Sequence, residues 1–349
     1  MRRTLISIVI GVGVGLMACL ALLVGFFFFY PNWLDSWLAE ATPVASASAT
    51  PPPVQAKTPA SQPSQTPWPT LLPVPESGAC GGPEQMTIAL LGVDGRGTDY
   101  RASRTDAITL VNVNFAKRTA ALLSFPRDLY VPLPNLQAHN ISQDRLNTAF
   151  EYGEIYKVPG GGPAEFKTTI EWNFGIRVDR YVMVNFGAFE AAVDALGGID
   201  VDVPVAIDDP KDPDNNYGTM DFSLPAGQQH MDGVTALRYA RTRHQDDDYH
   251  RVKRQQLVLL AIRDKLFSPE VIPQIPALAA TLGNLGRTDL TPTELVSLAC
   301  VGAQIDRSAI NAQTIDGTMV IPWSTPGGAS VSIPNRDLIA PVVVRFLGE

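Results

Sequence analysis

Three short apolar runs, each bounded by polar or turn residues, constrain the fold of this chain more than any other feature. They cover residues 86–93 (MTIALLGV), 107–113 (AITLVNV) and 120–125 (AALLSF). Runs of this length are typical of interior strands in a sheet that is covered on both faces. The fold therefore has to supply helices for both faces.

Segments of helical pattern follow these runs. The sequence predicts a helix start within 140–153 and helices over 163–174, 186–196, 233–238, 251–267 and 291–304. Further strands are expected at 181–186 and 199–205, with a polar loop over 206–224. The helix at 291–304 carries a capping-box pattern, Thr291 with Glu294 three residues later. This alternation indicates an α/β fold or an α/β/α sandwich, and no glycine-rich loop of the Walker or dinucleotide type is present.

The N-terminal segment has the composition of a membrane anchor. Residues 4–30 contain no charged side chain, which is long enough for a span of about 20 apolar residues. Because two arginines precede the run and acidic residues follow it, residues 1–3 are expected in the cytoplasm and the rest outside. A cleaved signal peptide is the alternative, although its apolar core is usually shorter, about 7–15 residues.

The chain after the anchor divides into a tether and one large domain. Residues 31–80 are rich in Pro, Ala, Ser and Thr, and bury too little apolar surface to fold alone. Residues 81–349 suit a single domain with no accessory domain after it. Outside the cytoplasm a disulfide between Cys80 and Cys300 is permissible, and two free thiols are the alternative. No cysteine spacing resembles a zinc site.

Arginines and aspartates gather where the first three strands begin or end. They are Asp94 and Arg96, then Arg104 and Asp106, then Arg127 and Asp128. Ligands of α/β sheets bind at such strand ends. Carboxylates, together with phosphate oxygens and water, are the ligands that Mg²⁺ prefers. The strand ends therefore predict a magnesium and phosphate site, although each pair taken singly also fits an ordinary turn or surface ion pair.

A second cationic cluster lies at residues 239–256 (YARTRHQDDDYHRVKRQQ), in a chain of formal net charge -8. Guanidinium groups suit phosphate oxygens, so the cluster indicates a phosphate or pyrophosphate pocket. The alternative is a solvated helix start with salt bridges to Asp246, Asp247 and Asp248. His244 and His250 flank the cluster and are interpreted as local hydrogen-bonding residues. The negative net charge argues against a nucleic-acid partner.

Taken together, the motifs resemble the LytR-CpsA-Psr family. They are LLGVDGR (90–96), SRTDAITL (103–110), LLSFPRDLYV (122–131), RLNTAFEYG (145–153), YVMVNFGAF (181–189), VDALGGIDVDVP (193–204), GQQHMDG (227–233) and the 239–256 cluster. The resemblance is strong over about residues 85–270. It implies an α/β/α sandwich with a central mixed sheet behind an N-terminal transmembrane helix. Arg145 stands where the family usually has lysine, which keeps the charge.

The resemblance also implies an activity. Family members are extracytoplasmic phosphotransferases that move a glycopolymer from a polyprenyl-pyrophosphate carrier to peptidoglycan or another envelope acceptor, with Mg²⁺ (Mn²⁺ as a second choice) on the pyrophosphate. The implied metal ligands are Asp94 and Asp106. The residues implied to bind pyrophosphate are Arg104, Arg127, Arg241, Arg243, Arg251 and Arg254, with Arg96 and Gln255 nearby.

The expected reaction is an in-line attack by an acceptor hydroxyl on the sugar-proximal phosphorus, driven by positioning and charge neutralisation. Catalysis is assigned to Arg104, Arg127, Arg241 and Arg243. Asp128 is either a base or, as we favour, a residue that orients Arg127. Two other classes remain: a pyrophosphatase or phosphodiesterase that uses water, and a non-catalytic polyprenyl-phosphate-binding protein.

Overall fold

The computed structural model describes residues 79–94, 103–213, 218–242, 248–268, 270–271 and 286–348, all within the unit Pro67–Glu349. The predicted anchor at 4–30 and most of the tether lie outside these residues. Among the described helices, none combines the length and apolar character that a membrane crossing needs. The anchor and the domain boundaries therefore stay predictions.

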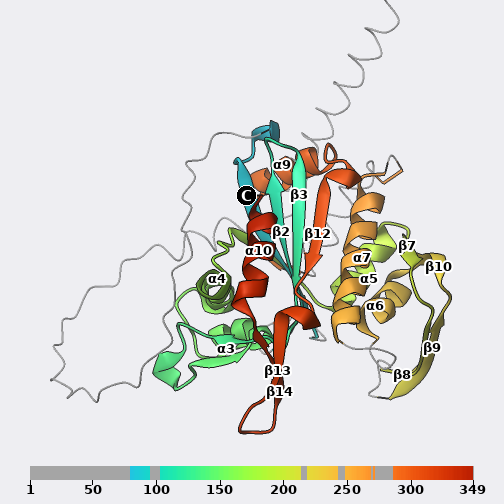
Figure 1. Cartoon of the computed structure of the whole chain (residues 1–349). Coiled ribbons are helices and arrows are strands. Elements are labelled where there is room, and N and C mark those ends of the chain that lie inside the picture. The colour runs from blue at the N-terminus through green and yellow to red at the C-terminus, as the bar shows by residue number, and fades with distance from the viewer. Residues whose placement is uncertain are drawn as a thin grey trace, which may run out of the picture. The chain divides into compact units, whose positions relative to one another are not determined.

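A six-stranded sheet forms the centre of the domain (Figure 1). Its order is β11 (Gly286–Thr288), β6 (Arg180–Val184), β1 (Gln85–Val93), β2 (Thr105–Asn114), β3 (Thr119–Phe125) and β12 (Ile310–Thr314). The β1–β6 and β3–β12 pairs are parallel, whereas β1–β2, β2–β3 and β6–β11 are antiparallel. The sheet is therefore mixed, and the three predicted apolar runs are confirmed as β1, β2 and β3.

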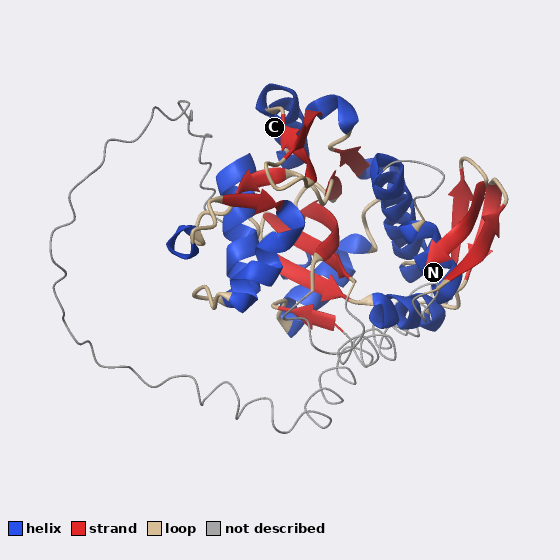
Figure 2. Cartoon of the chain, turned by 90° about the horizontal axis from the view of Figure 1, so that it is seen from below, coloured by secondary structure: helices blue, strands red, loops and turns tan. Residues whose placement is uncertain are grey.

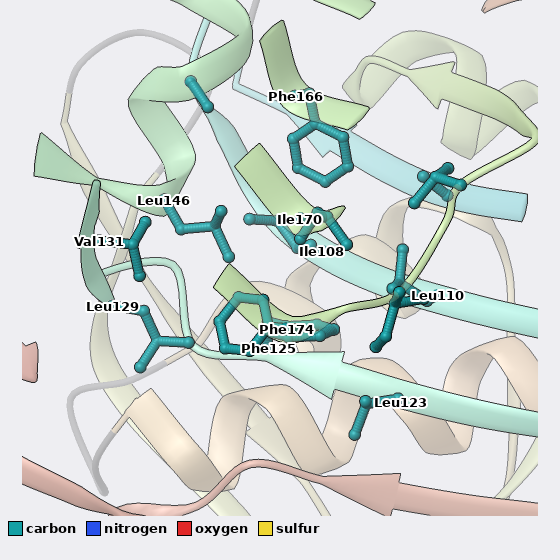
Figure 3. Packing of buried hydrophobic residues seen from close by; sticks show 14 of the residues in the cluster. Ile108, Leu110, Leu123, Phe125, Leu129, Val131, Leu146, Phe166, Ile170 and Phe174 are labelled. Carbon is teal, nitrogen blue, oxygen red and sulfur yellow. The ribbon is translucent and has the colours of Figure 1, made fainter. Parts of the chain in front are cut away.

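Helices cover both faces of this sheet, as Figure 2 shows. Alternate strand residues such as Leu91 and Leu123 pack under α3 (Ala149–Ile155), α4 (Gly161–Phe174) and α10 (Arg336–Leu347). Figure 3 shows this packing around Phe125 and Phe174, whose ring centroids lie 5.0 Å apart. On the opposite face, Ile88 packs with Val301 of α9 (Pro292–Gly302). The predicted α/β/α sandwich is confirmed, as is the capping box of Thr291 and Glu294 at the start of α9.

A second apolar core lies beside the sheet. It joins α5 (Phe186–Ala195), α6 (Gly233–Arg241) and α7 (Asp248–Leu266) to the pair β7 (Ile199–Val203) and β10 (Gly227–Met231). α7 also contacts the central sheet, because Gln256 Nε2 donates to Ser124 Oγ of β3 and to the Gln313 carbonyl of β12. α7 thereby connects the two cores.

The predicted polar loop at 206–224 is wrong. Apart from the undescribed residues 214–217, the segment forms two antiparallel strands, β8 (Ile207–Pro213) and β9 (Thr219–Leu224). Ile207, Phe222 and Leu224 are buried in the second core. The acidic residues of the segment suggested an exposed loop. Asp212, however, is buried and pairs with Arg238 of α6 at 2.7 Å.

The predicted helix start within 140–153 is confirmed, near the end of that range. α3 begins only at Ala149, because residues 143–145 form β5 (Gln143–Arg145) against β4 (Tyr130–Pro132). The Leu146 and Asn147 amides continue this pairing by donating to the carbonyls of Leu129 and Arg127 at 2.7 and 3.1 Å. A further hairpin that the sequence did not reveal, β13 (Val320–Ser324) with β14 (Ser330–Pro334), precedes α10.

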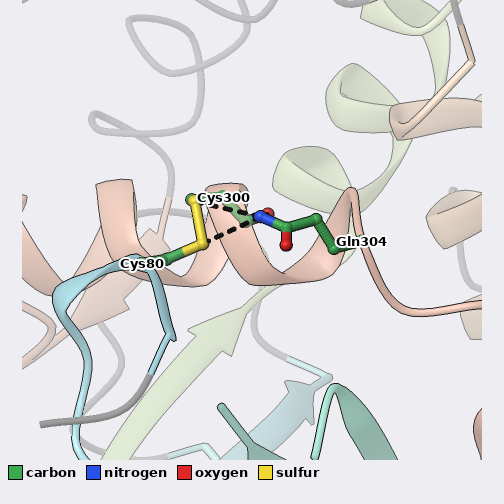
Figure 4. The surroundings of a disulfide bond; sticks show 3 residues. All are labelled: Cys80, Cys300 and Gln304. Atoms are coloured by element: carbon green, nitrogen blue, oxygen red, sulfur yellow. Dashed lines mark hydrogen bonds between the residues drawn. A yellow bond between two sulfur atoms is a disulfide. The ribbon is translucent and has the colours of Figure 1, made fainter. Parts of the chain in front are cut away.

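Cys80 and Cys300 form a disulfide, with their Cα atoms 5.7 Å apart (Figure 4). The bond joins the 3-10 turn at the start of the domain (Ala79–Gly81) to α9, across 220 residues of sequence. Gln304 Nε2 lies 3.0 Å from the Cys80 sulfur and donates to the Cys300 carbonyl. The structure thus resolves the two alternatives for these cysteines in favour of the bridge.

Candidate functional site

The strand register brings the predicted polar residues to one edge of the sheet. Val93, the last residue of β1, pairs with Thr105, the first residue of β2. Because the strands are antiparallel, Asp94 and Asp106 lie on opposite sides of this pair, Asp94 just after β1 and Asp106 as the second residue of β2. β3 and β6 also end at this edge, because Phe125 pairs with Ile108 and Gly92 pairs with Val184. The register thus places the ends of β1, β3 and β6 and the start of β2 at one edge of the sheet.

Asp106 is held by two side chains from other elements. Arg127 Nη1 donates to Asp106 Oδ2 at 2.6 Å, and Asn147 Nδ2 donates to Asp106 Oδ1 at 2.9 Å. Asn147 is itself fixed through its backbone, since its backbone carbonyl accepts from Thr105 Oγ1 and its backbone amide donates to the Arg127 carbonyl. Because each oxygen accepts a hydrogen bond, the Asp106 carboxylate is held in one orientation.

The negative charge of Asp106 affects the pKa of Asp94. Partial burial raises the pKa of Asp94 above its usual value, and the charge of Asp106 raises it further. Backbone hydrogen bonds and the charge of Arg104 act in the opposite direction. The two aspartates therefore interact electrostatically, as expected of carboxylates that share a site.

The donor set fits a magnesium ion that takes its remaining ligands from phosphate and water. Two interacting carboxylates supply hard oxygen atoms, and a cation between them would relieve their repulsion. The described residues contain no group of three or more His, Cys, Asp or Glu that could hold an ion on its own. The protein would thus provide part of the coordination shell, with Asp94 and Asp106 as its ligands.

Arg104 and Arg127 border the carboxylate pair with different exposure. The Arg104 side chain is 52% exposed, and its Nε lies 3.3 Å from Glu151 Oε2 of α3. The Arg127 side chain is 24% exposed. Both side chains are partly exposed, so both guanidinium groups are accessible to a ligand.

Arg241 reaches the same edge from α6. Its guanidinium carbon lies 4.2 Å from the centroid of the Phe186 ring. Phe186 begins α5 directly after Asn185, and Asn185 follows β6 and caps that helix through its side chain. A cation packed on an aromatic face is stabilised there. The stacking therefore places the Arg241 charge beside the end of β6.

Two residues of the cationic cluster hold α6 in place. Arg254 Nε donates to the Tyr239 carbonyl at 3.1 Å, and its Nη2 donates to the Thr242 carbonyl. Gln255 Nε2 donates to the Ala240 carbonyl at 3.3 Å. A cation and an amide at the C-terminal end of a helix satisfy its last carbonyls. Arg254, only 6% exposed, thus fixes the turn that carries Arg241.

Arg251 and Asp128 complete the described candidates. Arg251, also on α7, is 5% exposed. The Asp128 carboxylate accepts from Ser332 Oγ at 3.0 Å, and its carbonyl accepts from the Ser332 amide. Asp128 thereby holds β14 beside the edge that carries the aspartates, which favours a positioning role over that of a base.

The predicted site residues Arg96 and Arg243 lie outside the described residues, as do His244, Asp246 and Asp247 of the cationic cluster. Conversely, sequence reasoning missed Asn147 and Phe186 as site residues. Asn147 lies inside the RLNTAFEYG motif and Phe186 inside YVMVNFGAF, so the motifs held the signal. Their roles depend on contacts with Asp106 and Arg241, which no local pattern reveals.

The fold and the site together define an α/β/α protein with paired carboxylates and arginines at one sheet edge. The LytR_cpsA_psr family model matches residues 60–338, and the chain belongs to this family. Over 235 residues the chain is 30% identical to the polyisoprenyl-teichoic acid–peptidoglycan teichoic acid transferase TagV of Bacillus subtilis (strain 168), covering 67% of this chain and 57% of the relative.

Solved structures show the same fold. Bacillus subtilis TagV superimposes with a TM-score of 0.61 at 26% identity, covering 76% of this chain and 98% of that one. TagT bound to LIIa-WTA superimposes with a TM-score of 0.59 at 27% identity, covering 76% and 92%. The chain spans between about half and three fifths of the length of the curated relatives that it matches first.

Proposed function

We propose that this protein is a phosphotransferase that moves a glycopolymer from a polyprenyl-pyrophosphate carrier to a hydroxyl of peptidoglycan or another envelope acceptor. The observation that carries the proposal is the interacting pair Asp94 and Asp106, with Arg127 bound to Asp106 at the same sheet edge. The relatives named as teichoic acid transferases, and a neighbour solved with LIIa-WTA, support this choice of substrate class.

In the proposed reaction, an acceptor hydroxyl attacks the sugar-proximal phosphorus in line with the departing polyprenyl phosphate. A new phosphorus–oxygen bond forms, the bond to the lipid-side bridging oxygen breaks, and the hydroxyl proton is released. Magnesium, held by Asp94 and Asp106, would supply neutralising charge for the pyrophosphate.

The chain's own residues orient the substrate and balance its charge. Arg127 and Arg104 flank the carboxylates, and Arg241 approaches from the end of β6. Guanidinium groups bind phosphate oxygens through paired hydrogen bonds. Because these cations are positioned before substrate arrives, they stabilise the charge that develops in the transition state. Asp128 contributes by fixing β14 next to Arg127.

The proposal includes a single-pass anchor at residues 4–30, with a cytoplasmic N-terminus and an extracytoplasmic domain. A lipid-linked donor stays in the bilayer, so a tethered domain meets it at high effective concentration. The Cys80–Cys300 disulfide supports an extracytoplasmic domain, because such bonds persist in oxidising compartments.

The test uses the full chain in detergent, with a polyprenyl-pyrophosphate-linked saccharide as donor and a soluble peptidoglycan glycan as acceptor. We expect transfer that requires both substrates, stops with a chelator and returns with Mg²⁺. Arg127→Ala should lower transfer about 100-fold, while the melting temperature shifts by no more than about 2 °C. The exposed Arg177→Ala, whose guanidinium pairs with Asp179 away from the site, is the control.

The other two classes give different results in the same assay. Phosphate release that is unchanged when the acceptor is omitted would identify a pyrophosphatase. Donor binding without transfer, unchanged in an Asp94→Asn and Asp106→Asn double variant, would identify a binding protein. An equal loss of folding and activity in Arg127→Ala would assign that arginine to structure alone.

A further inference from the structure

A cavity of about 510 Å³ lies at the sheet edge opposite the carboxylates. It is bounded by the start of β1, the end of β2, the starts of β3 and β12, and the last turn of α10, near the C-terminal label in Figure 1. The polar side chains that line it include Gln85, Asn112, Asn114, Lys117, Asn311 and Arg345. Its volume lies within the range of about 300–1,000 Å³ typical of ligand pockets.

Two buried asparagines lie near the end of β2, one inside the strand and one at its last position. Asn112 and Asn114 are 5% and 6% exposed and lie on the same face of the strand. Asn112 Nδ2 makes only a long contact, 3.5 Å, with the Phe346 carbonyl. Asn114 Oδ1 accepts from the Lys117 amide at 2.7 Å. Asn114 is accounted for by the turn that it closes after β2. Asn112 lies inside the strand, where asparagine is disfavoured, so its buried amide at the cavity wall indicates a polar ligand.

Two cations stand at the rim of this cavity. Lys117 follows β2, and Arg345 lies in the last turn of α10. Within the part of the chain that the structure describes, neither makes an ion pair, and the lining includes no aspartate or glutamate. In a chain of net charge -8, a cavity whose described lining holds two cations and no acidic side chain favours an anionic ligand.

The end of α10 adds acceptors to these donors. Its last residues, Phe346 and Leu347, line the cavity together with Gly348, which caps the helix in the left-handed conformation at φ 82°. The terminal carbonyls of a helix accept hydrogen bonds from outside it. The oxygens of an inorganic anion mainly accept hydrogen bonds and so do not match carbonyl acceptors. The hydroxyl groups of a sugar, in contrast, donate to carbonyls and accept from amides.

We propose that this cavity, between β2 and the end of α10, is a second binding site for an anionic saccharide unit, with Lys117 and Arg345 binding the acid group and the amides binding hydroxyls. Asn112 and Asn114 lie six and eight residues along β2 from Asp106, so roughly 20–26 Å separate the cavity from the carboxylate pair. A glycan held at both places would have to be an oligomer. Binding of an acidic saccharide at this site does not depend on the proposed function. Only the assignment of that saccharide to an envelope glycan rests on the proposed function.

The experiment measures binding to the full chain in detergent by isothermal titration calorimetry, with an oligogalacturonate tetrasaccharide as the probe. Chitotetraose tests the need for charge, and inorganic phosphate tests the need for a sugar. We expect the Lys117→Gln and Arg345→Gln double variant to bind the acidic probe at least tenfold more weakly than the wild type. Chitotetraose and phosphate should bind the wild type at least tenfold more weakly than the acidic probe.

Matched controls separate this site from the general charge of the protein. Lys211→Gln with Arg336→Gln removes the same charges, one from β8 and one from the opposite end of α10, and should leave binding unchanged. Arg127→Ala should also leave it unchanged, even if no transfer activity is ever detected. Equal binding by the Lys117 and Arg345 double variant, or equally tight binding of phosphate alone, would overturn the proposal.

The transfer assay identifies the source of the saccharide. If the donor polymer occupies the cavity, the double variant should raise KM for a donor of many units and not for a donor of one unit. If the acceptor strand occupies it, KM for a long acceptor should rise instead. An unchanged KM for every substrate would overturn the assignment to an envelope glycan. The calorimetric result would still decide whether the cavity binds an acidic saccharide.

Discussion

Asp106 is the residue on which the site depends most, since it interacts with three other residues of the site. Arg127 and Asn147 bind one oxygen each, and Asp94 has its pKa raised by the same charge. A carboxylate fixed in this way cannot rotate to follow a passing cation, so its direction is set before any ligand arrives. Asn147 is not itself a predicted metal or phosphate ligand, and its side chain acts on the site through Asp106.

Replacing Asn147 by alanine tests this positioning role. We expect Asn147→Ala to lower the transfer rate by about 10–100-fold, the usual cost of removing a residue that orients a metal ligand. The apparent Mg²⁺ affinity, measured by titrating the metal in the assay, should fall as well. Asn173→Ala is the matched control, because Asn173 is equally buried but bonds the Pro132 and Thr169 carbonyls. It should lower the melting temperature and spare Mg²⁺ affinity.

Glu165 on α4 gives a prediction about pH. It is fully buried, and burial raises its pKa above the usual value, opposed by hydrogen bonds from Asn135 and Thr169. The unfolded chain ionises this group near pH 4.5, while the folded chain still holds the proton. Stability therefore falls as pH rises from about 4.5 through the folded pKa.

Glu165→Gln should remove this part of the pH dependence. Urea denaturation between pH 4 and 8 should show the variant gaining stability relative to the wild type as pH rises. Glu171→Gln, an exposed change on the same helix, should run parallel to the wild type. Parallel curves for both variants would mean that Glu165 ionises normally in the folded state.

At the scale of elements, helices and hairpins beside the central sheet set the position of single arginines. α7 binds the last carbonyls of α6 through Arg254 and Gln255, so it determines where Arg241 lies. The β8–β9 hairpin braces α6 from the other side through Asp212 and Arg238. A segment that reads as a polar loop is thus part of the support of the site.

Removing one partner of that brace should be costly. We expect Asp212→Ala to lower the free energy of unfolding by about 3 kcal/mol, because it leaves a largely buried guanidinium without its partner. Asp212 is 2% exposed, whereas Asp221 on the same hairpin is exposed, so Asp221→Ala should have little effect. Chemical denaturation measures both, and equal effects would contradict the bracing role.

At the scale of the whole molecule, one covalent bond joins the first and the late parts of the domain. The disulfide links Cys80, just before β1, to Cys300 on α9, which covers the sheet. Closing a loop of 220 residues removes much of the freedom of the unfolded chain. The bond therefore stabilises the sandwich where the chain enters it.

Loss of this bond should be visible in the whole domain's stability. We expect the Cys80→Ser and Cys300→Ser double variant to lose about 5 kcal/mol on the loop-closure estimate, measured by guanidinium denaturation. The wild type with reductant should match the variant, and the variant should not respond to reductant. A wild type that is insensitive to reductant would show that the bond contributes nothing.

The strands and the site edge were predictable because their signals are local. Apolar runs ended by Asp94, Asp106 and Arg127 identify both the strands and the polar groups at their ends. The β8–β9 hairpin and β5 were not predictable, because buried Asp212 and the pairing of Arg145 with Tyr130 depend on distant partners. The same holds for Arg254, which reads as a ligand-binding arginine yet bonds to α6.

The sequence by itself determined the family, the interior strands and the residue types available for phosphate chemistry, since each is written in a contiguous motif. The tertiary structure alone decided which carboxylates interact, which arginines are directed at the edge of the sheet and which brace it, and that Cys80 meets Cys300. The physical reason is that charge, burial and hydrogen bonding act through space, between groups that the chain separates by tens to hundreds of residues.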